Sequence, residues 1–144
     1  MNIRRAVATD ALALAVLERR QPLAAGWGEK GFASELIQPA ARIWCAEEAG
    51  ILQGFLALRF AAENCEILNV AVCPTHVRKG IGWKLLEHAL LYVKQQGVQR
   101  VSLEAAEHNQ PASKLYTKAG FCIVGRRKNF YGAGQDALIW GKDC

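Results

Sequence analysis

Two glycines, Gly80 and Gly82, follow the basic pair Arg78-Lys79 and open an apolar run with helical spacing. A strand pattern ends shortly before them, at Val72. The first N–H groups of a helix lack partners within the helix, and the helix dipole is positive at that end. Glycines at such a junction let an anion come close to the backbone. The stretch therefore predicts an anion site made of main-chain N–H groups.

The familiar nucleotide-binding motifs do not fit this stretch. A P-loop requires G-x-x-x-x-G-K-[ST], which the chain lacks. The dinucleotide-binding motif G-x-G-x-x-G requires glycine where Leu85 stands. A lone G-x-G pair also occurs in plain turns, so it identifies no ligand by itself. What remains is the geometry of a phosphate site at a helix N-terminus.

Two side chains elsewhere are candidates for proton transfer. Glu104 lies on the polar face of the alternating segment 98–105. Taken alone, it is also explained as a solvated carboxylate on a strand. Tyr116 shares one face of a short helix with Leu115, which is equally typical of a packing tyrosine.

Length and composition limit the kind of protein. With 144 residues, 51% of them hydrophobic and 22% charged, the chain is typical of one globular domain, 1–144. Its apolar runs are shorter than the roughly 18 residues of a membrane span, and its first residues lack the pattern of a signal peptide. We therefore expect a soluble, cytoplasmic monomer that does not bind a membrane.

Charge and cysteines argue against two other classes of site. The net charge is +5, but the basic residues are scattered in short clusters, so we discount direct nucleic-acid binding. A compact polyanionic ligand also suits this excess. The five cysteines are an odd number without C-x-x-C spacing, and the three histidines show no ligand spacing. We therefore expect no metal and no disulfide framework.

The elements that must position these residues follow from hydrophobic periodicity. Expected strands cover 2–7, 42–48, 51–60, 66–72, 98–105, 121–131 and 136–140; expected helices cover 10–19, 29–37, 81–96 and a short segment from Pro111 to before Gly120. The central strand, helix and strand should form a parallel crossover, and the flanking strands should pair as antiparallel hairpins. The predicted class is α/β, a mixed, mostly antiparallel sheet with helices on both faces.

The glycine stretch resembles the pyrophosphate loop of the Gcn5-related N-acetyltransferases (GNAT), [QR]-x-x-G-x-[GA]. The matching residues are Val77-Arg78-Lys79-Gly80-Ile81-Gly82, with Val77 where the family has Gln or Arg. The segment "NQPASKLYTKAGF" is similar to the more specific family pattern N-x-x-A-x-x-L-Y-x-x-x-G-F. The resemblance implies the GNAT fold and acetyl-CoA as cosubstrate, held by the six loop residues and by Asn109.

Within this family the chain is most similar to the bacterial ribosomal-protein alanine N-acetyltransferases of the RimI type. "GWGEKGFASEL" is similar to their W-x-E-x-x-F segment, and "ILNVAVCP" to their strand before the glycine loop, with Cys73 where Asp is usual. The resemblance spans nearly the whole chain. It implies that the acceptor is the N-terminal segment of a ribosomal protein, held between Trp27, Glu29 and Phe32 on one side and Tyr131 on the other.

The same resemblance implies roles in a direct acetyl transfer. Glu104 would be the general base, acting through a water, and Tyr116 the acid that protonates the coenzyme A sulfur. Backbone groups of Val70, Ala71 and Val72 would hold the thioester carbonyl and the pantetheine amides.

Simpler explanations stand beside several of these roles. Asn109 also fits the cap of its helix, the aromatic residues fit core packing, and Glu29 fits an ordinary surface carboxylate. The function has alternatives as well: a GNAT enzyme for a small amine or a lysine side chain, and a non-catalytic acetyl-CoA-binding module. Val77 favours the binding module weakly, whereas the presence of both Glu104 and Tyr116 argues against it.

Overall fold

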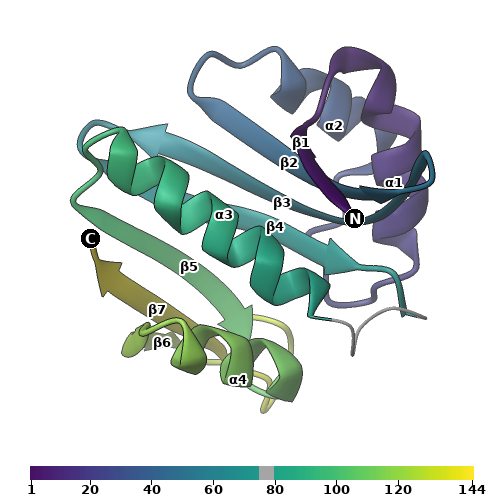
Figure 1. Ribbon diagram of the computed structural model, residues 1–144. Helices are drawn as coiled ribbons and strands as arrows, with labels where there is room; N and C mark the ends of the chain where they lie inside the picture. The colour runs from purple at the N-terminus through teal and green to yellow at the C-terminus, as the bar shows by residue number, and fades with distance from the viewer. Residues whose placement is uncertain (75–79) are drawn as a thin grey trace.

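The computed structural model describes residues 1–74 and 80–144 of the chain (Figure 1). In chain order its elements are β1 (Asn2–Arg5), α1 (Ala11–Arg19), α2 (Gly28–Leu36), β2 (Ala41–Glu48), β3 (Ile51–Ala61), β4 (Asn64–Val72), α3 (Ile81–Gln95), β5 (Arg100–Ala106), α4 (Gln110–Lys118), β6 (Cys122–Arg127) and β7 (Ala137–Asp143). A single 3-10 turn, Ala8–Asp10, precedes α1. This order confirms the one expected from hydrophobic periodicity.

The strands form a mixed sheet in the order β1-β2-β3-β4-β5-β7-β6. β4 and β5 pair in parallel, and the other neighbours pair antiparallel. α3 connects the parallel pair, since a parallel connection needs a crossover. The predicted mixed α/β class is therefore confirmed.

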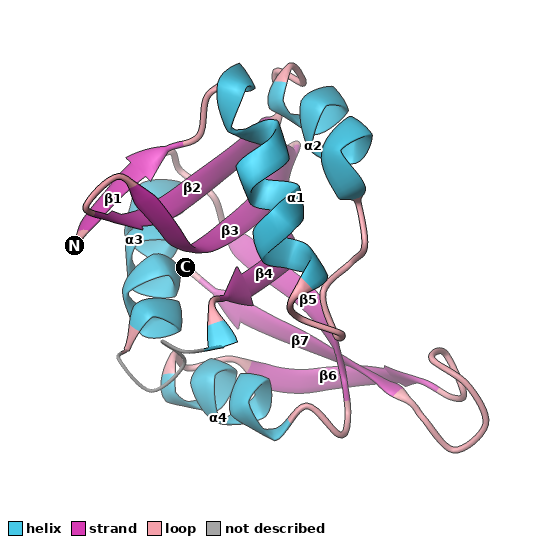
Figure 2. Ribbon diagram, turned by 90° about the vertical axis from the view of Figure 1, so that its right-hand side faces the viewer, coloured by secondary structure: helices cyan, strands magenta, loops and turns pink. Residues whose placement is uncertain are grey.

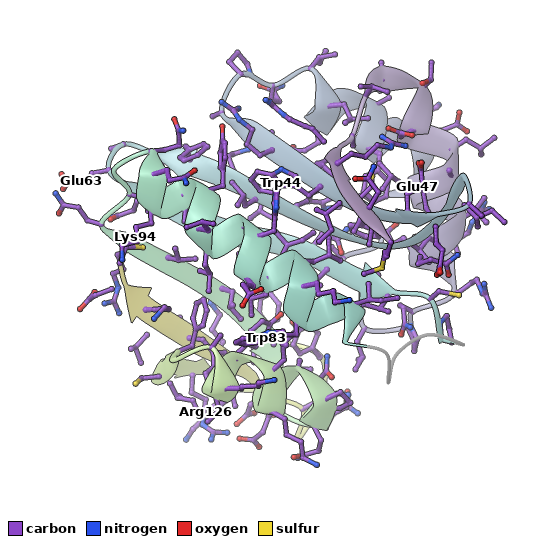
Figure 3. All side chains as sticks on the ribbon, viewed as in Figure 1. Trp44, Glu47, Glu63, Trp83, Lys94 and Arg126 are labelled. Atoms are coloured by element: carbon purple, nitrogen blue, oxygen red, sulfur yellow. The ribbon has the colours of Figure 1, made fainter. Side chains whose placement is uncertain are left out.

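Helices cover both faces of the sheet (Figures 1 and 2). Alternate residues of β3 serve the two faces, as the two-residue period of a strand requires. Leu56 and Leu58 pack in the core beneath α3, and Phe55 and Ala57 pack in the core beneath α1 and α2. On the α3 face, Trp83 also extends over α4, where Lys118 Nζ lies 4.3 Å from its ring centroid (Figure 3).

The two central strands separate toward their carboxyl ends. β4 pairs with β5 from Asn64 opposite Arg100 to Ile67 opposite Leu103, and their pairing ends there. On its other side β4 remains paired with β3 as far as Val72 opposite Gly54. The arrowheads of β4 and β5 accordingly diverge in Figure 1. Residues 68–72 of β4 thus present one edge of the strand to the opening.

The start of α3 is held close to this opening. Gly80 caps the helix in the left-handed conformation, with φ 73°, which glycine adopts without strain. Gly54 allows the helix to approach β3: a Cβ there would lie 3.1 Å from both Ile81 Cγ2 and Leu85 Cδ1. Packing against β3 therefore fixes the helix N-terminus beside the end of β4.

The expected boundaries were wrong at the last hairpin. The strand expected over 121–131 ends at Arg127, and residues 128–136 form a loop. Asn129 has a positive φ of 57°, and its N–H donates to Asp136 Oδ1 at 2.9 Å. This turn ends the pairing of β6 with β7 before Tyr131, because the N–H of Asn129 bonds to a side chain instead of to a partner strand.

Among the helices of the described residues, none combines the length and the apolar character needed to cross a membrane.

Candidate active site

A pocket of about 450 Å³ lies where β4 and β5 separate. The segments that line it are residues 23–25 after α1, 67–70 of β4, 103–106 of β5, Asn109 and Tyr116 around α4, and Phe130 with Tyr131 in the β6–β7 loop. The pocket thus brings together five of the residues singled out from the sequence: Val70, Glu104, Asn109, Tyr116 and Tyr131.

The exposed edge of β4 provides main-chain groups to this pocket. Cys73 N donates to Gln53 O at 2.7 Å, so Cys73 and Gln53 are a hydrogen-bonded pair of the β3–β4 ladder. In an antiparallel ladder such pairs alternate with pairs whose N–H and C=O groups point away. Val72 and Val70 therefore turn their backbone groups toward the opening. Gln21 Nε2 confirms this direction for Val72, since it donates to Val72 O at 2.5 Å.

The same alternation corrects the expectation for Ala71. Its main-chain groups face β3, opposite Phe55, and its side chain is buried in the core beneath α1 and α2. A residue whose N–H and C=O belong to the ladder has none left for a ligand. For Val70 and Val72 the expected backbone role remains a prediction, whereas Ala71 has no free main-chain group for it.

Glu104 reaches the pocket from β5. Its side chain is 25% exposed, and its Oε1 lies 3.0 Å from Nη2 of Arg127. The carboxylate therefore combines access to water with a fixed orientation, both of which a general base needs.

Tyr116 reaches the pocket from α4. It is 6% exposed and packs against Phe121 and Trp140, with ring centroids 5.8 and 6.0 Å away. Burial raises the pKa of Tyr116 to about 12, because desolvation disfavours the phenolate. The phenol therefore carries its proton at neutral pH and is able to donate it.

Asn109 caps α4, as the simpler explanation predicted. Its Oδ1 accepts a hydrogen bond from Ala112 N at 3.3 Å, and Pro111 occupies the first turn. The side chain also lines the pocket. A contact to the cofactor remains a prediction.

The glycine loop is described only from Gly80 onward. Val77, Arg78 and Lys79, expected to bind the cofactor, lie outside the described residues. The side chain of Ile81 is buried in the core, which leaves its N–H as the group for a ligand.

Gly82 is not required by packing. A Cβ there would lie 3.5 Å from Leu115 Cδ2 and 3.7 Å from Val72 Cγ2, which are ordinary contacts. Because alanine would fit, the close approach of an anion to the helix terminus remains the reason to expect glycine at this position.

Of the four residues expected to contact the acceptor, only Tyr131 is among those that line the pocket. Tyr131 lines it and packs edge-on against Phe130, with ring centroids 5.0 Å apart. Trp27 instead lines a neighbouring pocket, which shares Leu68 with the first. Glu29 is exposed on α2 and lines neither.

Phe32 is a core residue, contrary to the expectation that it contacts the acceptor. It is 0% exposed and lies edge-on to Trp27 at 5.3 Å and to Phe55 at 5.2 Å. A side chain enclosed in this way stabilises α2 against the sheet and has no surface left for a ligand.

Sequence reasoning missed three polar residues around the pocket: Glu18, Asn69 and Arg127. Glu18 and Asn69 are buried and hydrogen-bonded to each other. One signal was readable, since Glu18 occupies a helical position four residues after Leu14, on the apolar face of α1. Nothing in the sequence pairs Arg127 with Glu104, because that contact depends on how the strands assemble.

The arrangement suits direct transfer of an acyl group to an amine. A carboxylate, a protonated phenol and an outward main-chain N–H line one pocket beside a helix N-terminus. These are the groups that take a proton, give a proton and stabilise a developing oxyanion. In residues 1–74 and 80–144, no three His, Cys, Asp or Glu side chains are grouped to hold a metal ion.

Comparison with known proteins agrees with this geometry. The model of the acetyltransferase (GNAT) family matches residues 11–121. A Bacillus subtilis protein named as a putative [ribosomal protein bS18]-alanine N-acetyltransferase is 34% identical over 115 residues, covering 78% of this chain and 76% of the relative. The [ribosomal protein bS18]-alanine N-acetyltransferase of Escherichia coli strain K12 is 30% identical over 116 residues, covering 78% of each chain.

Solved structures share the fold over almost the whole chain. The crystal structure of the ribosomal-protein-S18-alanine N-acetyltransferase from Escherichia coli has a TM-score of 0.89 at 28% identity, covering 99% of this chain and 92% of its own. An aminoglycoside 6'-N-acetyltransferase solved in complex with coenzyme A has a TM-score of 0.85 at 17% identity, covering 99% and 97%, and shows the fold alone. The family model and the two relatives together show that this chain belongs to the acetyltransferase (GNAT) family.

Proposed function

We propose that this protein transfers the acetyl group of acetyl-CoA to the N-terminal α-amine of a protein, and that the acceptor is the N-terminal alanine of ribosomal protein S18. The observation that carries the proposal is the pocket between β4 and β5, which Glu104 and Tyr116 line together with the free edge at Val70. The names of the relatives with 34% and 30% identity support the choice of acceptor.

The fold provides a fitting place for acetyl-CoA. The outward backbone groups of Val70 and Val72 suit the amides of the pantetheine arm, which need donors and acceptors in alternation. Gly80 and Gly82 place the N-terminus of α3 beside them, where the dipole attracts phosphate. The coenzyme A complex of the aminoglycoside acetyltransferase, which shares this fold, supports the assignment.

The chemistry needs one attack and two proton transfers. The neutral amine attacks the thioester carbonyl, whose oxygen becomes negative and is stabilised by the N–H of Val70. Glu104 takes the proton of the amine through a water, and the carbon–sulfur bond breaks as Tyr116 protonates the leaving sulfur. Phe121 and Trp140 keep the phenol dry, which preserves its proton until the thiolate forms.

The choice of an α-amine follows from proton affinity. An α-amine has a pKa of about 7.7–8.0, whereas a lysine side chain has a pKa of about 10.4. At neutral pH a much larger fraction of the α-amine is neutral and able to attack. A carboxylate base such as Glu104 therefore serves an N-terminal acceptor better than a lysine.

The acceptor must enter between two segments that line the pocket. Residues 23–25 contribute one of them, with the small side chains of Ala24 and Ala25, and Phe130 with Tyr131 contribute the other. The first residue of the acceptor would therefore be recognised by these two segments.

A thiol-release assay with acetyl-CoA tests the proposal. The panel contains an Ala-starting peptide copying the S18 N-terminus, the same peptide with its α-amine blocked, and small amines. We expect turnover of the free peptide and none of the blocked one, with mass spectrometry placing the acetyl group on the α-amine. Acetylation on lysine, or turnover of small amines alone, would reject the proposed acceptor; no turnover of any amine by protein that binds acetyl-CoA would favour a binding module.

A further inference from the structure

A buried carboxylate outside the proposed catalytic groups joins α1, α2 and β4. Glu18, near the end of α1, is 3% exposed. Its Oε2 accepts hydrogen bonds from Asn69 Nδ2 at 2.7 Å and from Trp27 N at 2.9 Å, and its Oε1 accepts one from Gly28 N at 3.0 Å. Asn69, 4% exposed, accepts a hydrogen bond from Ala25 N at 3.1 Å through its Oδ1. Figure 2 shows α1 crossing the sheet at this place.

The donors around Glu18 explain why a carboxylate occupies this buried position. Trp27 and Gly28 are the N-cap and first residue of α2, so their N–H groups have no partners within the helix. The dipole of α2 is positive there and stabilises the negative charge. Three donors converge on the two oxygens, and a glutamine would turn its own NH₂ group toward at least one of them. Only a group with two accepting oxygens satisfies all three.

The network attaches one wall of the pocket to β4. Ala25 belongs to the lining segment 23–25, and Asn69 directly precedes Val70 in the strand. On the other side of Val70, the bond from Gln21 Nε2 to Val72 O holds the chain just before this segment. The chain between α1 and α2 is thus tied to β4 on both sides of the residue whose N–H faces the opening.

We propose that Glu18 and Asn69 are positioning residues that set the distance between the wall at residues 23–25 and Val70, and thereby decide which first residue of an acceptor is taken. The identity of the acceptor rests on the proposed function. An amine that attacks a carbonyl held at Val70 must pass this wall. A misplacement of about 1 Å in such a wall can change a rate by about 10²-fold. The network does not touch Gly80 or Gly82, where the phosphates are proposed to bind, so acetyl-CoA affinity should change less than the acceptor KM.

Two substitutions separate this role from general stability. Glu18→Gln keeps the size of the side chain and removes one acceptor, and Asn69→Ser removes the amide that bridges Glu18 and Ala25. Glu48→Gln is the matched control, because it changes an exposed carboxylate that does not line the pocket. For each protein we would measure acceptor KM and kcat with peptides starting in Ala and in Leu, acetyl-CoA affinity by calorimetry, and amide hydrogen exchange at Ala25, Trp27 and Gly28.

We expect both variants to raise the KM of the Ala-starting peptide by about 10- to 100-fold and to narrow the preference for it over the Leu-starting peptide. Exchange at the three amides should become faster, acetyl-CoA affinity should change less than the acceptor KM, and the control should stay at wild-type values. Faster exchange with unchanged KM and preference would overturn the inference, as would an equal loss of kcat for every acceptor. If Glu18→Gln does not fold, the same measurements on Asn69→Ser alone test the inference.

Failure of the proposed function can be told apart from failure of this inference. In that case the wild-type protein itself would not turn over the peptide. The KM of whichever amine does turn over, compared between wild type and Asn69→Ser, would then decide the inference.

Discussion

Arg127 holds the carboxylate of Glu104 from two strands away, with its Nη2 3.0 Å from Glu104 Oε1. The two residues lie on β6 and β5, which do not pair with each other because β7 lies between them. The same guanidinium lies over the ring of Phe130, 5.6 Å from its centroid. Arg127 therefore links the proposed base to the loop that carries Phe130 and Tyr131.

Replacing Arg127 by Gln should reduce kcat/KM modestly. More than half of the Arg127 side chain is exposed, and exposed ion pairs contribute about 1 kcal/mol or less, which corresponds to at most about a fivefold loss. The difference from wild type should shrink at high salt because ions screen the pair. Arg126→Gln is the control, since Arg126 pairs with Glu107 and Asp136 instead. A loss as large as that of Glu104→Gln would instead indicate direct contact of Arg127 with the reacting groups.

Tyr116→Phe should slow the reaction without weakening the binding of acetyl-CoA. The ring keeps its contacts with Phe121 and Trp140 and loses only the hydroxyl. A positioned acid contributes about 10²- to 10⁴-fold to a rate, so kcat should fall by a factor in that span. Single-turnover rates check the slower reaction, and calorimetry with acetyl-CoA checks the unchanged binding. A variant that loses about 1 kcal/mol of stability but little rate would show that Tyr116 serves packing alone.

The pKa of Tyr116 also predicts how stability depends on alkaline pH. Burial raises this pKa from 10.0 in the unfolded chain to about 12 in the fold. The stabilisation linked to it is complete below pH 10 and is lost as the pH rises to about 12, because the unfolded state releases the proton first. The loss approaches about 1.4 kcal/mol per pH unit in that window. Urea unfolding of wild type and Tyr116→Phe isolates the effect: the stability difference between them should change across this window and stay constant below it.

Gly82 provides a test of the cofactor site that does not depend on turnover. Gly82→Asp would place a negative charge at the N-terminus of α3, where the phosphates of acetyl-CoA should bind, and should weaken binding about tenfold or more. Gly82→Ala is the matched control, because its methyl group fits beside Leu115 and Val72. Calorimetry measures both affinities. An unchanged affinity in folded Gly82→Asp protein would show that acetyl-CoA binds elsewhere.

The element order was predictable because the hydrophobic period agrees with the positions of proline and glycine along most of the chain. Segment 66–72 is a strongly apolar run that stops before Pro74, and the helix 81–95 keeps one apolar face that ends before Gly97. Both patterns reflect burial, which the spacing of apolar residues records directly. Segment 121–131 lacked such a signal, because its end is set by the bond between Asn129 and Asp136 rather than by hydrophobic spacing.

The site was predictable to the extent that it depends on local motifs. Glu104 and Tyr116 belong to recognisable segments, and both line the pocket. Phe32 and Ala71 were misplaced because the side that each residue faces depends on the assembled sheet. The bond between Glu18 and Asn69 joins residues 51 positions apart, and no spacing rule connects two such residues in a single sequence.

The separation of β4 and β5 also divides the sheet into two halves. In the described residues, four residue pairs between Asn64–Ile67 and Arg100–Leu103 join the β1–β4 half of the sheet to the β5–β7 half. Beyond Leu103 this ladder ends, and the two halves are held together by the core beneath α3, which includes Leu58 of one half and Trp140 of the other. A ligand that touches Val70 on one half and Tyr116 on the other would add a further link between them, so its binding should stiffen the sheet.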